Sequence, residues 1–521
     1  MRALIPLVVL LPLLGAAFAL IAGRRPRLQT GVTVAVLSAV LAIGGVLLFT
    51  VDANGAYSVE IGGWPAPFGI VLVVDRLSAL LVTVSAAVLL SVLVFSVGQG
   101  LADGDRETPV SIYNPTYLIL AAGVFNAFIA GDLFNLYVSF EILLAASYVL
   151  ITLGGTPQRI RAGTTYIVVS LVSSVIFLAA IAMIYGATGT VNIAQLSVRL
   201  GQLPEDIQLI LHVMLIVAFG IKAAVFPLSF WLPDSYPTAP APVTAVFAGL
   251  LTKVGVYAIM RTEMIIFPGD ELNTPLMIAA LLTMVVGILG AVAQADIKRL
   301  LSFTLVSHIG YMLLGIGLGT AAGLSAAIYY VVHHITVQTT LFLAAGLVER
   351  QGGTTSINRL GGLLKASPVI GVLFFIPMLS LGGIPPFSGF IGKLALFDAS
   401  AKDGSWLAYV LIGAGALVSL LTLYALSRAW NMVFWRPESE LEEGPALAHP
   451  PGEEVLPVQE ARTAPRIMLG ATGAMVALSV ALTVFAGPLY AVSSRAGDNI
   501  TGPDYYISTV FGDTLQGGGH E

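Results

Sequence analysis

The chain has 521 residues, of which 57% are hydrophobic and only 10% are charged, and its mean hydropathy is +0.91. A water-soluble protein of this length needs far more surface charge, so the composition predicts an all-α integral membrane protein. The formal net charge is −5 and no basic patch is present, so no nucleic-acid partner is expected. The chain has no cysteine, which excludes disulfides, thiolate zinc sites and iron–sulfur ligation by its own residues.

Apolar runs of about 20 residues recur along the chain and predict 14 transmembrane helices. Glycines and prolines at 62–67 predict a short hairpin or turn, and residues 192–201 predict a short surface helix. The predicted spans are Ala3–Ala22, Gly31–Thr50, Ile70–Val97, Pro115–Ala130, Leu133–Leu153, Gly163–Tyr185, Ile207–Phe230, Thr238–Met260, Pro275–Ala295, Leu301–Gly319, Gly323–Val348, Pro368–Ala399, Trp406–Trp435 and Ile467–Tyr490.

The distribution of basic residues predicts the orientation of these spans. We interpret the first span as a retained helix rather than a signal peptide, because most of the nearby positive charge follows it. With 14 crossings, most lysines and arginines of the loops fall on the side opposite the termini. The positive-inside rule therefore predicts that both termini lie outside.

Glycine and proline interrupt the predicted seventh and twelfth helices, close to Lys222 and Lys393. Broken helices at corresponding places in two halves are typical of inverted-repeat transporters, and their freed carbonyls can bind an ion or water. The predicted division is 1–112 for helices 1–3, 113–262 for a first repeat of helices 4–8, 270–436 for a second repeat of helices 9–13, 437–465 for an acidic, proline-rich, disordered cytoplasmic loop, and 466–521 for helix 14 and a polar tail.

Ionisable residues inside the predicted spans are the candidate functional residues, because such groups are costly in a membrane and are functional by default. Glu141 lies about nine residues into the fifth helix, and we pair it with Lys222. An isolated buried carboxylic acid stays neutral and a nearby ammonium restores its charge, so a pair of variable separation can take up and release a proton. The alternative is a fixed ion pair that only holds two helices together.

Lys253 and Lys393 have no carboxylate partner within their own helices, apart from Asp398 near the end of the twelfth. A desolvated lysine gives up its proton more readily than one in water, which suits a relay station or an exit gate. The alternative is that each ammonium extends to the membrane interface.

Histidines are the second group of relay candidates, because an imidazole can accept a proton at one nitrogen and donate one from the other. His333 and His334 form a pair in the middle of the eleventh helix, and His308 and Gln338 are secondary candidates nearby. His212, on the seventh helix, is a weaker candidate. The alternative for each histidine is a hydrogen-bonded structural role, which is the usual one for a single buried histidine.

Two sequence stretches resemble a known family. KAAVFP at 222–227 with WLPDSYPTAP at 231–240 resembles the proton-antiporter-like membrane subunits shared by respiratory complex I, membrane-bound hydrogenases and Mrp cation/proton antiporters. GDLFNLYVSFEILLAASYVL at 131–150 is most similar to the D-type subunits of Mrp antiporters.

This resemblance implies a proton-translocating subunit of a multi-subunit Na⁺/H⁺ antiporter in the bacterial cell membrane, driven by proton motive force. It implies 14 helices with two inverted repeats, key positions at Glu141, Lys222, Lys253 and Lys393, other antiporter subunits as partners, and no cofactor or enzymatic activity. The sequence departs from many relatives at Gln338, where they carry a lysine. The alternatives are a proton-pumping subunit of a redox-driven complex and a subunit whose charges are only structural.

Overall fold

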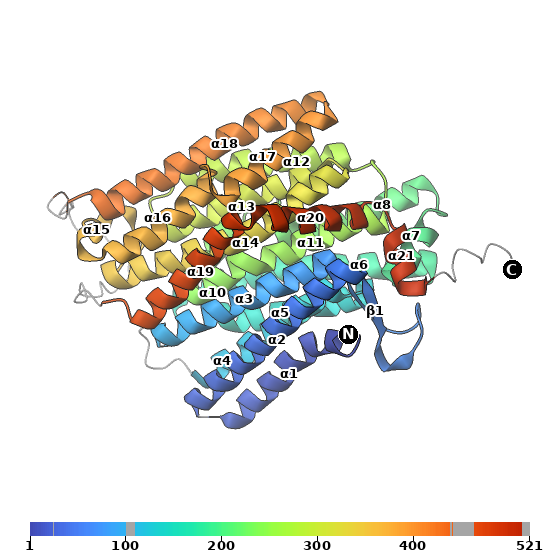
Figure 1. Cartoon of the computed structure of the whole chain (residues 1–521), viewed down its shortest axis with the longest axis horizontal. Helices are drawn as coiled ribbons and strands as arrows, with labels where there is room; N and C mark the ends of the chain where they lie inside the picture. The colour runs from blue at the N-terminus through green and yellow to red at the C-terminus, as the bar shows by residue number, and fades with distance from the viewer. Residues whose placement is uncertain (24, 101–109, 438–439, 441–462, 513–521) are drawn as a thin grey trace.

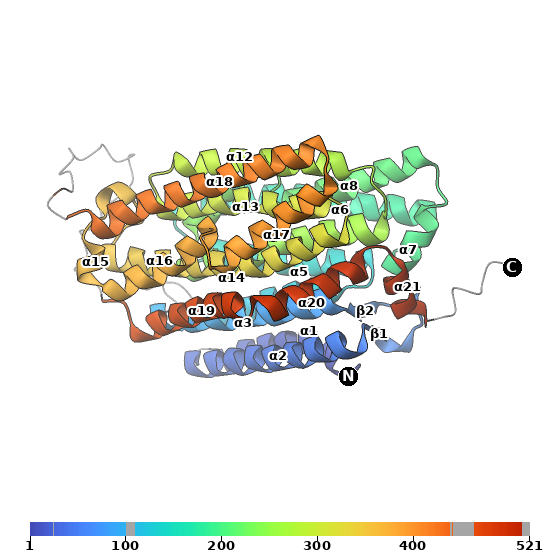
Figure 2. The same cartoon turned by 45° about the horizontal axis from the view of Figure 1, so that its top comes forward.

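Long helices packed side by side make up the part of the chain that the computed structural model describes, residues 1–23, 25–100, 110–437, 440 and 463–512 (Figures 1 and 2). Within these ranges, 13 helices are long and apolar enough to cross a membrane, and the shorter apolar helix Pro368–Gly382 belongs to the predicted twelfth span. The predicted loop 437–465 falls almost entirely outside the described residues.

The chain begins with helices and a small hairpin. These elements are α1 (Leu4–Ala22), α2 (Pro26–Asn54), β1 (Tyr57–Glu60), the turn η1 (Ile61–Gly63), β2 (Val71–Val74) and α3 (Arg76–Gln99). The two strands are antiparallel, with Tyr57 opposite Val74. The hairpin predicted from the glycines and prolines at 62–67 is therefore confirmed.

The middle of the chain contains the first broken span. Its elements are α4 (Val110–Ile129), α5 (Leu133–Ile151), α6 (Pro157–Thr188), α7 (Ile193–Leu200), α8 (Glu205–Ala223), α9 (Leu232–Ser235), η2 (Tyr236–Thr238), α10 (Ala241–Val246), η3 (Phe247–Leu251), α11 (Thr252–Arg261) and η4 (Thr262–Ile266). The surface helix predicted at 192–201 is α7. The predicted seventh span ran to Phe230, which is wrong because the helix ends at Ala223 and Ala224 adopts a left-handed φ of 59°.

The second half contains the second broken span. Its elements are α12 (Asn273–Val292), α13 (Ile297–Gly317), α14 (Ala321–Gly352), η5 (Ile357–Arg359), α15 (Leu363–Ala366), α16 (Pro368–Gly382), α17 (Ser388–Asp403), α18 (Trp406–Trp430) and η6 (Asn431–Trp435). The interruption predicted by the glycines and prolines at 382–386 separates α16 from α17.

The C-terminal part differs from the sequence prediction. It comprises α19 (Arg466–Val484), α20 (Ala486–Ile500) and α21 (Asp504–Phe511), whereas the predicted last helix ended at Tyr490 and was followed by a polar tail. The buried residues of α20 are Ser493, Ala496, Gly497 and Ile500, which follow helical periodicity. The small side chains of this face let α20 pack against α14, where Gly497 contacts Ala321 and Ser325.

The two ends of the bundle differ. One end carries α7, the hairpin and α21, which contact one another, and we call it the termini end because Met1 contacts Thr50 close to β1 (Figure 2). The other end carries α15. Asp132 and Asp296 begin α5 and α13 as caps, and each bridges a residue the same number of positions later, Asn192 and Ser356. The two halves of the chain thus share this arrangement, and the inverted repeats stay a prediction.

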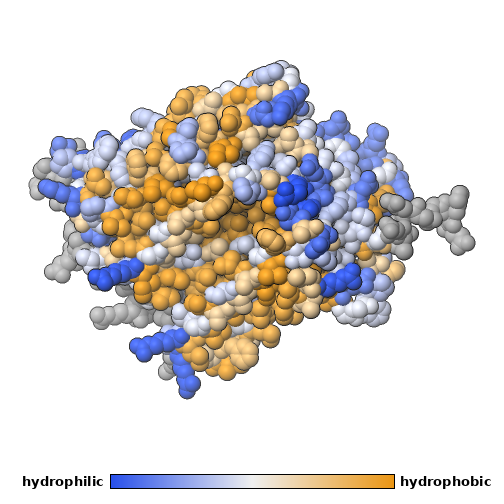
Figure 3. All heavy atoms as spheres, viewed as in Figure 1, coloured by the Kyte–Doolittle hydropathy of each residue, from blue (hydrophilic) through white to orange (hydrophobic). Residues whose placement is uncertain are grey.

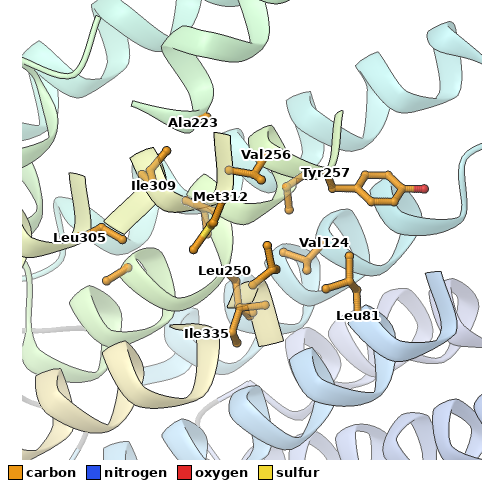
Figure 4. Packing of buried hydrophobic residues seen from close by; sticks show 14 of the residues in the cluster. Leu81, Val124, Ala223, Leu250, Val256, Tyr257, Leu305, Ile309, Met312 and Ile335 are labelled. Atoms are coloured by element: carbon orange, nitrogen blue, oxygen red, sulfur yellow. The ribbon is translucent and has the colours of Figure 1, made fainter. Parts of the chain in front are cut away.

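Burial divides the helices into an inner and an outer set. The most apolar stretches of Ala241–Ile266 and Ala321–Gly352 are fully buried. In Pro26–Asn54, only 28% of the most apolar stretch is buried. Leu250, Ile309, Met312 and Ile335 are among the side chains that pack in the centre (Figure 4). Apolar residues cover the middle of the face seen in Figure 3, and polar residues gather mostly toward its ends. These features are those of a multi-pass membrane protein.

A buried ion pair joins three parts of the chain at the termini end. Arg261 of α11 lies 2.6 Å from Asp75, the cap of α3, and each side chain is 3% exposed. The guanidinium also lies over the rings of Tyr257 and of Tyr506 from α21. The predicted span Thr238–Met260 stopped one residue before Arg261, and this end is wrong because the helix continues through η4 to Ile266.

We predict that Arg261→Ala destabilises the protein by about 3–5 kcal/mol, because it leaves the Asp75 carboxylate buried without its partner. The measurement is the temperature at which the detergent-solubilised protein loses its fold. The matched control is Arg495→Ala, whose side chain is 45% exposed and pairs with Asp52, and which should cost at most about 1 kcal/mol. Equal losses in the two variants would contradict this prediction.

Candidate functional site

The break after α8 positions Lys222 in its last turn. The polar backbone groups that the break frees find partners in other segments. The Trp231 indole donates to the carbonyl oxygen of Ile221 at 3.2 Å, and the amide of Phe226 donates to Thr283 Oγ1 at 3.1 Å. Non-helical backbone at membrane depth is tolerated only where it is satisfied in this way inside protein. The contacts therefore stabilise the break and hold Lys222 in place.

A serine connects Lys222 to Glu141. The Lys222 ammonium donates to Ser174 Oγ at 2.9 Å and to the carbonyl oxygen of Ser170 at 3.3 Å, and the Ser174 hydroxyl donates to Glu141 Oε1. Lys222 also lies over the Phe140 ring. The carboxylate and the ammonium predicted to pair are thus brought together, with a hydroxyl that bridges them. A hydroxyl can accept from one group and donate to the other, so it offers a direct route for a proton.

A small cavity adjoins the Lys222 side chain. Its volume is about 10 Å³, and its lining includes Tyr166, Ser170, Trp231 and Tyr236. That volume is close to the minimum for one water molecule. The Tyr236 hydroxyl is buried and has no protein partner, so a water in this cavity would have polar groups to bind.

Lys253 lies fully buried at the start of α11, directly after the π-helical turn η3. Its ammonium donates to the carbonyl oxygen of Ala248 in that turn. π-helical turns rearrange the backbone hydrogen bonds of a helix and are frequent at functional sites. The neighbouring Thr252 hydroxyl is buried without a protein partner. The ammonium is therefore held in the interior and does not reach an interface.

Imidazole and phenol rings form a contiguous cluster between α13 and α14. His308 Nδ1 lies 2.7 Å from the Tyr330 hydroxyl, and the His308 and His334 ring centroids are 5.4 Å apart. The Tyr330 and His333 ring centroids are 5.3 Å apart, and His333 Nδ1 lies 2.9 Å from Ser388 Oγ on α17. Three of the four predicted histidines are thus brought together, and the cluster spans the distance from α13 to the second broken helix.

Several buried polar atoms in this region have no protein partner. They are both ring nitrogens of His334, Nε2 of His333 and Oε1 of Gln338, whose Nε2 donates to the carbonyl oxygen of Leu301 at 2.7 Å. Buried polar groups are normally hydrogen-bonded, and water is the partner that remains available to these atoms.

Lys393 lies beside the second break. Its ammonium donates to the carbonyl oxygen of Leu381 at 2.9 Å and to Ser419 Oγ at 2.6 Å. The carbonyl is free to accept because α16 ends at Gly382, and Gly383 has a φ of 83°. Gly389 lets α17 approach the histidines, because a Cβ atom there would lie 3.0 Å from His333 Nε2 and collide with the Ser380 carbonyl oxygen.

Two predicted residues lie apart from this row. The Asp398 carboxylate pairs with Lys402 at 2.6 Å on an exposed face of α17. His212 pairs with Glu263 near the termini end. Several residues of these sites were not predicted, among them Ser174, Ser419, Tyr330 and Glu263. The serines and Tyr330 lie inside predicted apolar spans, where such residues are common, and Glu263 fell beyond the predicted end of its helix.

The fold and the row of buried charged and titratable side chains define a class: multi-pass membrane proteins with an ionisable interior, as in proteins that move ions. A match to the family described as NADH:quinone oxidoreductase/Mrp antiporter, TM, covers residues 130–422. The chain belongs to this family, which confirms the resemblance found in its motifs.

Individual relatives agree with this assignment. The chain is 39% identical to the D-type subunit of a Na⁺/H⁺ antiporter from Alkalihalophilus pseudofirmus, over 98% of this chain and 99% of that one. It resembles a chain of the Mrp complex from Dietzia sp. with a TM-score of 0.88 and 33% identity, covering 98% and 99% of the two chains. A chain of respiratory complex I from Thermus thermophilus shares the fold, with a TM-score of 0.78, 24% identity and coverage of 96% and 100%.

We predict that Ser174→Ala lowers the rate of ion transport about tenfold. The variant removes the hydroxyl group that connects Glu141 to Lys222, and a barrier raised by about 1.4 kcal/mol corresponds to a factor of ten in rate. The measurement is the transport rate per assembled complex. Ser173→Ala is the matched control, because Ser173 is buried on the same helix but donates to the carbonyl oxygen of Ala218. A normal rate in Ser174→Ala would show that the bridge is dispensable.

Proposed function

We propose that this chain is the proton-translocating subunit of a multi-subunit Na⁺/H⁺ antiporter in the bacterial cell membrane. The observation that carries the proposal is the row of buried groups from Lys222 through Lys253 and the histidines to Lys393, with the half-buried Glu141 beside Lys222. Isolated charges in a membrane interior are destabilising, and a chain that keeps several of them in one row has a use for them. The assembly partners are the other antiporter subunits, and the relatives named as antiporter subunits support a transporter rather than an enzyme.

The proposed route uses side chains and water in turn. A proton passes between Glu141 and Lys222 through the Ser174 hydroxyl, and the cavity beside Lys222 supplies a water. Lys253 then exchanges protons through water with the cluster of His334, His308 and Tyr330. The buried nitrogens and amide oxygen without a protein partner give such water its hydrogen bonds.

The last step leads from the cluster to Lys393. His333 and Ser388 link α14 to α17, and the Lys393 ammonium lies over the Tyr311 ring, 5.1 Å from its centroid. Tyr311 and His308 are themselves in ring contact. We place the termini end outside, as the basic residues of the loops at the α15 end favour. Proton motive force then drives protons inward and Na⁺ outward.

A second candidate is a subunit of a redox-driven proton pump, which the shared fold with the complex I chain supports. In that case electron transfer in partner chains would drive the same row of lysines. The relatives named as antiporter subunits, at 39% identity, favour the antiporter. Dependence of transport on NADH or quinone separates the two candidates.

The purified complex in liposomes, without electron donors, should release protons when a Na⁺ gradient is imposed. Lys393→Ala should remove more than about nine tenths of this exchange, because it removes the proton carrier at the second break. Lys402→Ala is the matched control, since this lysine is 68% exposed on the same helix, and it should exchange normally. The measurement is the change of a pH-sensitive dye.

Two results would contradict the proposal. If assembled Lys393→Ala complexes exchange at the normal rate, the buried charges are structural. If the unmodified complex exchanges only with NADH or quinone present, the redox-driven alternative holds.

A further inference from the structure

We propose that His212 and Glu263 form a proton-loading site at the termini end, separate from the row of lysines and histidines. The inference rests on the proposed function, because it names where protons enter from the face that this end occupies. Neither residue belongs to the row between Glu141 and Lys393. Both are buried, although each lies near the end of a helix that carries one of the row's lysines.

The two side chains lie close enough to share a proton in a hydrogen bond. His212 Nε2 lies 2.6 Å from Glu263 Oε1, and the side chains are 4% and 1% exposed. The imidazole stacks on Phe267, with 4.4 Å between centroids and 8° between planes. Stacking and the hydrogen bond fix the ring, so its Nδ1 edge keeps one orientation. A fixed imidazole whose Nε2 is engaged by a carboxylate presents its other nitrogen for proton exchange.

A cavity gives the imidazole access to solvent. Its volume is about 160 Å³, it is open to the surface, and its lining includes His212, Phe267, Gln208, Glu205 and Glu271. At about 30 Å³ per water, it has room for roughly five molecules. The two glutamates are exposed, so they place negative charge at the mouth. Negative charge on the walls of a cleft concentrates cations, including protons, at its entrance.

The helices that carry the pair are those that carry Lys222 and Lys253. His212 precedes Lys222 on α8, and Glu263 follows Lys253 on the helix formed by α11 and η4, so each pair of residues is about 15 Å apart along the axis. The two helices approach closely near the lysines, where a Cβ atom on Gly255 would lie 2.7 Å from the backbone nitrogen of Ala223. The two packed helices therefore extend as one unit from the cavity to the lysines.

The chemistry at the site is a reversible proton transfer. Water in the cavity gives a proton to the imidazole, and Glu263 balances the positive charge that results. The reverse transfer returns the proton to water or passes it inward. The residues of the buried face of α8 between His212 and Lys222 are apolar: Leu215, Ala218, Phe219, Gly220 and Ile221. A proton that moves inward from the loading site therefore needs water to carry it past this face.

Other charged groups near the pair set its electrostatic environment. Arg261 is engaged by Asp75, and Arg199 of α7 donates to the carbonyl oxygen of Thr188. The remaining titratable groups at this end of the elements packed against the pair are Tyr185 of α6, Tyr257 of α11, Glu205 and Asp206 of α8, and Asp270 and Glu271 after η4. The acidic residues at the mouth thus outnumber the basic ones, which makes the mouth attractive to cations.

The experiment uses the purified complex in liposomes, with the pH varied separately on the two faces. In Glu263→Gln and in His212→Gln, the proton concentration on the termini face that gives the half-maximal exchange rate should rise about tenfold. The corresponding concentration on the other face should not change. Asp403→Asn, which alters an exposed carboxylate on α17, is the control and should leave both midpoints unchanged.

A second pair of variants tests the proposal if the His212 and Glu263 variants misfold. Glu205→Gln and Glu271→Gln alter only exposed residues of the cavity mouth, and together they should shift the same midpoint in the same direction by a smaller amount. The proposal is overturned if assembled His212 and Glu263 variants keep the normal midpoint, or, where these do not assemble, if the double mouth variant keeps it. Failure of the unmodified complex to exchange would instead overturn the proposed function.

Discussion

A buried ammonium needs hydrogen-bond acceptors, and most carbonyl groups of a continuous helix already accept one hydrogen bond along the axis. Lys393 takes its acceptor from the end of α16, where the chain breaks. Lys253 takes one from the π-helical turn η3. Lys222, at the last turn of α8, uses a serine hydroxyl and a carbonyl group of α6 instead. The end of α16 and the π-helical turn η3 therefore supply acceptors for two of the three lysines, and the α6 helix supplies those of the third.

The arrangement of the bundle keeps these lysines in the interior. The helices that carry Lys253 and the histidines are the most buried, so lipid-facing helices surround the polar row on its sides. In the low dielectric of such an interior, a change of charge at one lysine acts strongly on the next. Hydroxyl and imidazole groups lie between the lysines and carry no permanent charge. In the proposed route, the transfer of one proton along the row can thus change the electrostatic energy of the groups at its far end without any large movement of the helices.

Much of the site could be predicted because ionisable residues are rare in apolar spans. Glu141, Lys222, Lys253 and Lys393 stand out in the sequence, and prolines mark both breaks. The bridging role of Ser174 could not be predicted, because a serine in a membrane helix usually only bonds its own backbone. Glu263 was missed because π-helical turns carry α11 on past the predicted end of its span, and no sequence signal marks such turns. The helical periodicity of α20 was visible in the sequence, but the sequence did not show that α20 packs against α14.

The contrast between Glu141 and Glu263 shows how position gives one residue type two roles. Both carboxylates bind a group that can carry a proton, Ser174 with Lys222 in one case and His212 in the other. Lys222, which Glu141 reaches through Ser174, lies beside a cavity with room for about one water, whereas the His212–Glu263 pair borders one with room for several. A group in contact with many waters equilibrates with the solution outside, and a group in contact with one exchanges only with its neighbours. In the proposed route, water access rather than residue identity therefore separates the loading of a proton from its transfer through the membrane interior.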